Sequence, residues 1–123
     1  MNRITSLLNL AKEELTTAQL LLDNPRDRAC ISRSYYAIYY AAEALLESKN
    51  INSRTHKGII KLFGEHFIKT GELPTELAKA FSDTYDLRKL RDYDETYTIT
   101  SAQAEAAIAY AQVFVEQAEN FLT

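Results

Sequence analysis

Residues 32–46 read SRSYYAIYYAAEALL, a run that holds four tyrosines and only two charged residues. Apolar and aromatic residues recur through this part of the chain at spacings of three and four, at Ile31, Tyr35, Ile38, Ala42 and Leu45. This spacing predicts an α-helix over about residues 25–48. Because the middle of the helix is apolar or aromatic nearly all round, we expect more than one neighbouring element to cover it. Some of its tyrosines should lie at an interface or a pocket edge, since a buried hydroxyl needs a partner.

The rest of the chain repeats the same periodicity. It predicts helices over about residues 2–23, 55–69 and 101–122, and a further one that begins at Pro74. Asn24 is expected to cap the helix of residues 25–48, with Pro25 as its first residue. Ser53 or Thr55 is expected to cap the helix of residues 55–69, and Gly71 to end it.

The last helix carries the sequence signature of a capping box, Thr100 followed three residues later by Gln103. The polar segment from Asp92 to Ile99 is expected to be a loop. Together these elements predict an all-α fold, an up-and-down bundle of four or five helices. We expect residues 1–123 to form one domain, because the length suits a single core.

The composition agrees with a helical domain and excludes several classes of protein. Three Gly and two Pro are too few for a β-sandwich or a Gly-rich phosphate loop. One Cys cannot form an internal disulfide, and no His, Cys, Asp and Glu cluster has metal-ligand spacing, so we predict no metal and no cofactor. No signal peptide or membrane-spanning run is present, and we expect a cytoplasmic protein without a membrane partner.

The net charge of −3 hides an uneven distribution. Residues 1–91 hold all 14 Lys and Arg against 11 Asp and Glu, whereas residues 92–123 hold six Asp and Glu and no Lys or Arg. An acidic total argues against a dedicated DNA-binding protein and leaves room for a local basic patch.

Four segments, in order along the chain, carry a resemblance to a known family. They are SRSYYAIYYAAEALL (32–46), RTHKGIIKLF (54–63), FIKTG (67–71) and RKLRDYD (88–94). Together they resemble the HEPN domain (higher eukaryotes and prokaryotes nucleotide-binding), and in particular its small stand-alone prokaryotic members, over roughly residues 5–120.

This resemblance implies a helical bundle that is usually a homodimer. It also implies one half of a two-component, toxin–antitoxin-type system whose partner is a minimal nucleotidyltransferase. The chain would then bind nucleotide or RNA. In related pairs the transferase adds AMP to a HEPN tyrosine, and Tyr93 or Tyr97 would be the acceptor here.

Many family members are metal-independent ribonucleases whose site is an Arg followed after four to six residues by His. That motif is absent here, because Tyr93, Asp94 and Glu95 follow Arg88 at the fifth to seventh positions, and no His follows Arg91 either. The sequence therefore leaves open whether the chain is an enzyme. There are two alternatives. The first is a ribonuclease acting through Arg88 or Arg91, and the second is a non-enzymatic helical interaction module.

Two groups of residues are the candidate sites. In the first, Arg88, Asp92 and Tyr93 are the candidate catalytic group, with Arg88 holding a phosphate, Asp92 orienting it and Tyr93 donating or stacking. A helix-terminal ion pair is the structural alternative. The second group is predicted to bind ligand, and its members are Arg54, His56, Lys57, Arg91, Arg33 and Tyr36. For these, a solvated basic face and an aromatic core or dimer seam are the alternatives, and His66 is expected to be partly buried in the core.

Overall fold

The computed structural model describes residues 2–24, 26–93 and 95–123, with the side chains of residues 91–93 outside the described part. Within these ranges the chain is all-helical and has no strand, which confirms the predicted fold class. The elements are α1 (Arg3–Asp23), α2 (Asp27–Glu47), α3 (His56–Phe63), the π-helical segment η1 (Gly64–Ile68), α4 (Thr75–Tyr93) and α5 (Ser101–Leu122).

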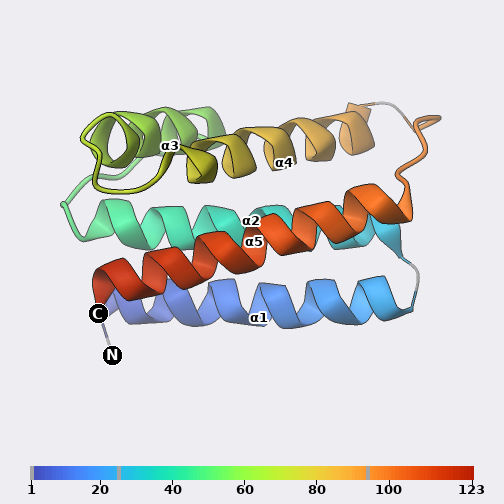
Figure 1. Ribbon diagram of the computed structural model, residues 1–123, viewed down its shortest axis with the longest axis horizontal. Helices are drawn as coiled ribbons and strands as arrows, with labels where there is room; N and C mark the ends of the chain where they lie inside the picture. Colours follow the sequence, from blue (N-terminus) through green and yellow to red (C-terminus); the bar gives the residue numbers. More distant parts are fainter. Residues whose placement is uncertain (1, 25, 94) are drawn as a thin grey trace.

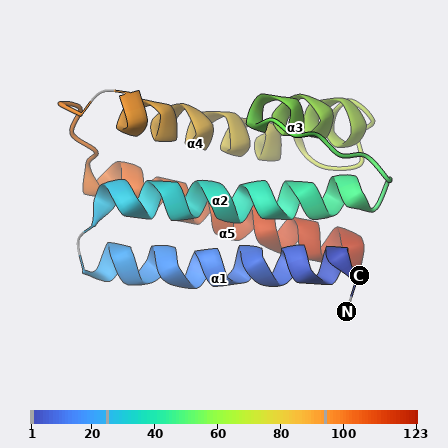
Figure 2. The same ribbon diagram turned by 180° about the vertical axis from the view of Figure 1, so that it is seen from behind.

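The helices form a bundle with α2 and α5 in the middle (Figures 1 and 2). α1 covers one side of this central pair, while α3 and α4 lie end to end and cover the other. α2 contacts each of the other four α-helices, which is the position predicted from its apolar circumference. The two chain ends lie close together at one end of the bundle (Figure 1).

Side-chain caps fix several of the helix starts. Asn2 accepts a hydrogen bond from the Thr5 N–H, and Thr55 accepts one from the Gly58 N–H. The predicted capping box is present, because Thr100 and Gln103 each accept from the other's backbone N–H. Gly71 has a positive φ of 78° just after η1, in agreement with its predicted role at the end of that segment.

Two boundary predictions were wrong. Asn24 does not cap α2: it closes α1, where its backbone N–H and its Nδ2 both donate to the Leu20 carbonyl, and Arg26 precedes α2 instead. Pro25, predicted to open that helix, lies outside the described residues. The loop after α4 also starts later than expected, because the helix continues through Asp92 and Tyr93. Helical hydrogen bonding prolongs α4 beyond the point where its apolar pattern stops.

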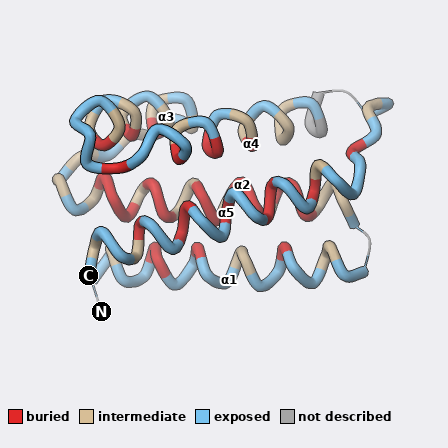
Figure 3. The backbone as a smooth tube through the Cα atoms, in the orientation of Figure 1, coloured by how far each residue is buried: buried red, intermediate tan, exposed pale blue. Residues whose placement is uncertain are grey.

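The core is densest along α2, as Figure 3 shows. Alanines of this helix are fully buried and let its neighbours approach closely, at Ala37, Ala41, Ala42 and Ala44. Phe114 of α5 packs against Phe63 of α3 and Phe81 of α4, with ring centroids 5.1 and 5.7 Å away. This aromatic contact packs the outer layer, α3 and α4, against the central pair.

Candidate functional site

The candidate site lies where α2, the first residue of α3 and the second half of α4 meet. Its centre is a cluster of tyrosines around one histidine and one arginine, here called the His56–Arg88 cluster: Tyr35, Tyr36 and Tyr39 of α2, His56 of α3, and Tyr85 and Arg88 of α4. The sequence predicted His56 and Arg88 as members of two separate patches, whereas the fold brings both against the same tyrosines.

His56 is half-buried and held on two sides by α2. Its Nδ1 lies 2.6 Å from the Tyr35 hydroxyl oxygen, which is hydrogen-bond distance. Its ring stacks on Tyr39, with ring centroids 4.5 Å apart and planes 23° apart. The imidazole is therefore fixed both in position and in the tilt of its plane.

Arg88 reaches the same tyrosines from α4. Its Nη2 donates to the Tyr36 hydroxyl at 3.1 Å. The guanidinium carbon lies 5.3 and 5.2 Å from the ring centroids of Tyr35 and Tyr36, within the range of cation–π attraction. Tyr36 was predicted as a ligand-binding residue, and its contact with Arg88 makes it part of the cluster rather than of a dimer seam alone.

The electrostatics of the cluster favour neutral side chains around one permanent cation. Burial lowers the pKa of His56 below its ordinary value, and the positive charge of Arg88 lowers it further. Burial raises the pKa of the Tyr35 hydroxyl, against the smaller opposite effect of Arg88. At neutral pH His56 is thus an uncharged imidazole and Tyr35 an uncharged phenol, beside the Arg88 guanidinium.

The loop before α3 explains how His56 is placed. Ser53 Oγ accepts from the Thr55 N–H, and Thr55 in turn caps the helix through the Gly58 N–H at 2.9 Å. A Cβ added to Gly58 would lie 2.1 Å from Ser53 Oγ and 2.7 Å from Thr55 Oγ1, closer than real atoms approach. A glycine at position 58 therefore permits the tight loop that presents His56 to α2.

Other candidates surround the cluster. Arg33 lies beside it, with its guanidinium 5.1 Å from the Tyr36 ring centroid and an ion pair to Glu14 of α1 at 2.9 Å. Arg54 and Lys57 are exposed on either side of His56 in the chain. They add positive charge next to the cluster, and their predicted role in ligand binding stays a prediction.

The remaining candidates are Arg91, Asp92, Tyr93 and Tyr97. Arg91, Asp92 and Tyr93 belong to the last turn of α4, and their side chains lie outside the described part, so the predicted pairing of Arg88 with Asp92 has no test here. Tyr97 is half-buried, and its hydroxyl accepts a hydrogen bond from Gln103 Nε2 at 3.1 Å. His66 is half-buried in η1, as predicted.

Sequence reasoning missed Tyr35, Tyr39 and Tyr85 as site residues. The spacing of Tyr35 and Tyr39, four residues apart, shows that they share a helix face, but that spacing is equally typical of core residues. The signal that distinguishes them is the polar partner: Tyr35 is fully buried and its hydroxyl contacts His56. Such a partner lies on another element and is invisible in the local pattern.

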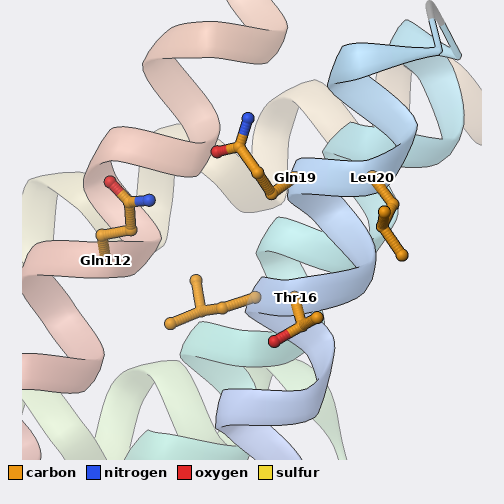
Figure 4. A pocket seen from close by; sticks show the side chains of 5 residues that line it. Thr16, Gln19, Leu20 and Gln112 are labelled. Atoms are coloured by element: carbon orange, nitrogen blue, oxygen red, sulfur yellow. The ribbon is translucent and has the colours of Figure 1, made fainter.

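Two hollows lined by described residues lie away from the cluster. One is lined by Leu15, Thr16, Gln19 and Leu20 of α1 and by Gln112 of α5 (Figure 4). Another is lined by residues 26–29 at the start of α2. The first holds no charged side chain, so it offers nothing to a phosphate.

Among the described residues, no group of three His, Cys, Asp or Glu side chains could hold a metal ion. None of the described helices is both long and apolar enough to cross a membrane.

Comparison with known proteins decides the family. The family model of the HEPN domain matches residues 4–121. The chain belongs to the HEPN family. The resemblance drawn from the four sequence segments is thereby confirmed, as is the helical bundle that it implied.

The HEPN chain also has relatives of similar length. Two proteins of Methanocaldococcus jannaschii, each named "Putative toxin", are 36% and 32% identical to it over 119 residues, which is 97% of this chain and 88% and 81% of theirs. A protein of Gloeobacter violaceus named "UPF0332 protein" is 38% identical over 117 residues, which is 94% of this chain and 93% of the relative.

Proposed function

We propose that this HEPN chain is the toxin-like component of a cytoplasmic two-component system with a minimal nucleotidyltransferase, and that it binds nucleotide or RNA through the His56–Arg88 cluster. The observation that carries the proposal is the meeting of His56 and Arg88 on Tyr35 and Tyr36. The toxin names of two relatives support the system proposed. A guanidinium and an imidazole flanked by aromatic rings suit a phosphate group and the base beside it.

The binding arm of this proposal is tested by fluorescence anisotropy with a labelled short single-stranded RNA and by calorimetry with AMP. Arg88→Ala should weaken binding by roughly tenfold or more, because it removes a charge-assisted hydrogen bond. Lys12→Ala is the control, since the Lys12 side chain forms its ion pair with Glu119 of α5 rather than with a member of the cluster. Equal binding by the two variants would overturn the proposal, as would wild-type protein that binds neither probe.

A metal-independent ribonuclease acting through Arg88 or Arg91 is the second candidate. One observation favours it: the linear Arg–His motif is absent, yet a neutral histidine lies close enough to Arg88 for that cation to lower its pKa. A ribonuclease predicts cleavage of RNA in the presence of a chelator, lost in Arg88→Ala or Arg91→Ala. Binding without cleavage supports the first proposal. A protein that shows no binding and no cleavage supports the non-enzymatic interaction module.

Modification by the proposed partner concerns Tyr93 or Tyr97. The phenol oxygen would attack the α-phosphorus of ATP, forming a tyrosyl–AMP bond while pyrophosphate leaves and the phenolic proton passes to solvent. The hydrogen bond from Gln103 to Tyr97 holds that hydroxyl in place near the start of α5. Intact mass after incubation with the partner and ATP tests this step. An adduct that survives Tyr93→Phe and Tyr97→Phe together would overturn it.

A homodimer is part of the same proposal. α5 exposes large apolar side chains at Tyr110, Val113 and Phe121, which a monomer gains nothing by exposing. A second copy of the chain covering them would bury this surface. Light scattering coupled to size exclusion tests it: we expect twice the mass of the 14.0 kDa chain, and Val113→Glu should return the single mass. A wild-type mass of one chain would overturn the homodimer.

A further inference from the structure

One proton lies between Tyr35 and His56, and its position determines what His56 can do. Tyr35 is fully buried. Within the described part of the structure, the hydrogen-bond partner of its hydroxyl is His56 Nδ1, at 2.6 Å. A phenol has one proton to donate, and the neutral imidazole has one nitrogen that accepts and one that donates.

Two arrangements are possible, and burial distinguishes them. If Nδ1–H donated to the Tyr35 oxygen, the hydroxyl proton of Tyr35 would be left in the protein interior with no acceptor. An unmade hydrogen bond of a buried polar group is disfavoured. If Tyr35 donates to Nδ1 instead, the buried hydroxyl and Nδ1 are both paired, and the neutral imidazole carries its proton on Nε2.

The groups that face His56 keep it in this uncharged form. They are Tyr35, Tyr36 and Tyr39 on α2 and Arg88 on α4. The tyrosines shield the ring from water, and the arginine repels a second positive charge. The lowered pKa of His56 agrees with this geometry.

We infer that His56 is a neutral hydrogen-bond donor: it presents Nε2–H beside the Arg88 guanidinium to a phosphoryl oxyanion, and Tyr35 is the positioning residue that fixes this tautomer. The inference rests on the proposed nucleotide or RNA binding and names its chemistry, a phosphate monoester or diester. Both donors keep their protons at neutral pH, so an oxyanion finds one charged and one neutral donor in a preformed, partly desolvated setting.

This tautomer allows His56 to bind a phosphate group but not to take a proton during RNA cleavage. With Nδ1 occupied by Tyr35 and a proton already on Nε2, His56 has no free lone pair with which to accept the proton of an attacking hydroxyl. It therefore does not act as a general base. The two donors hold a phosphate group in place, which fits the first proposed function and not the ribonuclease.

The tautomer is measured directly by NMR on 15N-histidine-labelled protein. The chain has two histidines, and His66→Gln assigns the spectrum because His66 lies in η1, outside the cluster. We expect the His56 spectrum at pH 7.5 to show an unprotonated Nδ1 and a protonated Nε2, and Tyr35→Phe to abolish this fixed pattern. A protonated Nδ1, or an imidazolium, would overturn the inference without any ligand being present.

Binding is measured with three probes. The first is a dinucleoside monophosphate, whose phosphodiester does not titrate near neutrality. AMP serves as the phosphate monoester and inorganic phosphate as the free ion. We expect affinity for the diester to stay level from pH 7 to 8.5, His56→Ala to weaken it roughly tenfold, and His56→Gln to restore most of it, because the amide of Gln is also a neutral donor. Affinity that falls as the pH rises would show that a charged His56 is required and would overturn the inference.

The arms also separate the sources of the phosphate group. Tighter binding of AMP than of the dinucleotide assigns a monoester, and the reverse assigns an RNA backbone. Either result agrees with the inference, provided that His56→Ala binds more weakly than His56→Gln and the wild type. If wild-type protein binds none of the three probes, the proposed function fails, whereas the NMR result still stands or falls by itself.

Discussion

The two sides of α2 pack against their neighbours through different kinds of contact. On the side toward α1 and α5, Ala44 packs with Leu7 and Leu8, while Ile31 packs with Ala104 and Ala107. On the side toward α3 and α4, Tyr35 contacts His56, Phe81 and Tyr85 through its ring or hydroxyl. The buried part of the first side depends on the shape of apolar side chains, whereas on the second side a buried polar group needs a partner of defined geometry.

This difference indicates which changes cost stability and which cost function. A close-packed apolar surface loses free energy when an atom is removed, and it carries no chemistry. A hydrogen-bonded aromatic cluster loses less stability on a conservative change but loses the position of its functional groups. Changes on the apolar side should therefore have the larger effect on stability, and changes in the aromatic cluster the larger effect on binding.

The largest effect is expected on the apolar side. Ile31→Ala removes a fully buried side chain and should lower the free energy of unfolding by about 3 kcal/mol, because it leaves a cavity. Chemical denaturation measures it. Leu20→Ala is the control, since Leu20 is 58% exposed and its loss should change stability by less than ~0.5 kcal/mol. Ligand affinity per folded molecule should stay the same in both variants. A loss of affinity in Ile31→Ala would show that the two sides are not separable.

The next effect concerns two helical glycines whose surroundings differ. Gly58→Ala should cost roughly 1–3 kcal/mol, since the new Cβ would overlap Ser53 and Thr55, and it should displace His56 and weaken binding. Gly64→Ala meets nothing within 4 Å and should stabilise the protein by up to ~1 kcal/mol, because alanine favours the helix. Thermal unfolding compares them; two variants of equal stability would contradict the tight loop described above.

The sequence predicts the two sides of α2 to different extents, because one depends on local patterns and the other on contacts between distant residues. The helices, the capping box and the central place of α2 follow from periodicity and from local capping residues such as Thr100 and Gln103, so they could be read directly. The meeting of His56 with Arg88 depends on the angle at which α3 and α4 pack on α2. That angle is set by contacts between distant residues, Phe114 with Phe63 and Phe81 among them, which no local pattern encodes.

A pH effect of intermediate size should be confined to the polar side. The pKa of His56 is lowered in the folded state, so the unfolded chain binds the proton more readily. The contribution of His56 to stability is therefore complete above its unfolded pKa of about 6.5 and is lost as the pH falls through the lower folded value. The unfolding midpoint of the wild type should drop more between pH 7.5 and 5.5 than that of His56→Gln. Parallel drops would show that another group titrates.

The smallest effect is expected at the edge between the two sides, where Arg33 pairs with Glu14. Burial raises the pKa of Glu14 more than the adjacent Arg33 lowers it, so desolvation outweighs the attraction. The pair is also partly exposed, and such pairs contribute about 0–1 kcal/mol. Glu14→Gln should therefore change the free energy of unfolding by less than ~0.5 kcal/mol at pH 7.

The pH dependence of Glu14→Gln shows whether burial or the attraction to Arg33 dominates at Glu14. A raised folded pKa means that protonated Glu14 is favoured in the folded state, so this contribution is present below the unfolded pKa and is lost as the pH rises through the folded value. Relative to Glu14→Gln, the wild type should be most stable at acid pH and lose that advantage toward neutrality, as denaturation at several pH values would show. If the wild type instead gained stability relative to the variant as the pH rose, the attraction to Arg33 would outweigh desolvation. The edge of the His56–Arg88 cluster would then be held by charge rather than by packing.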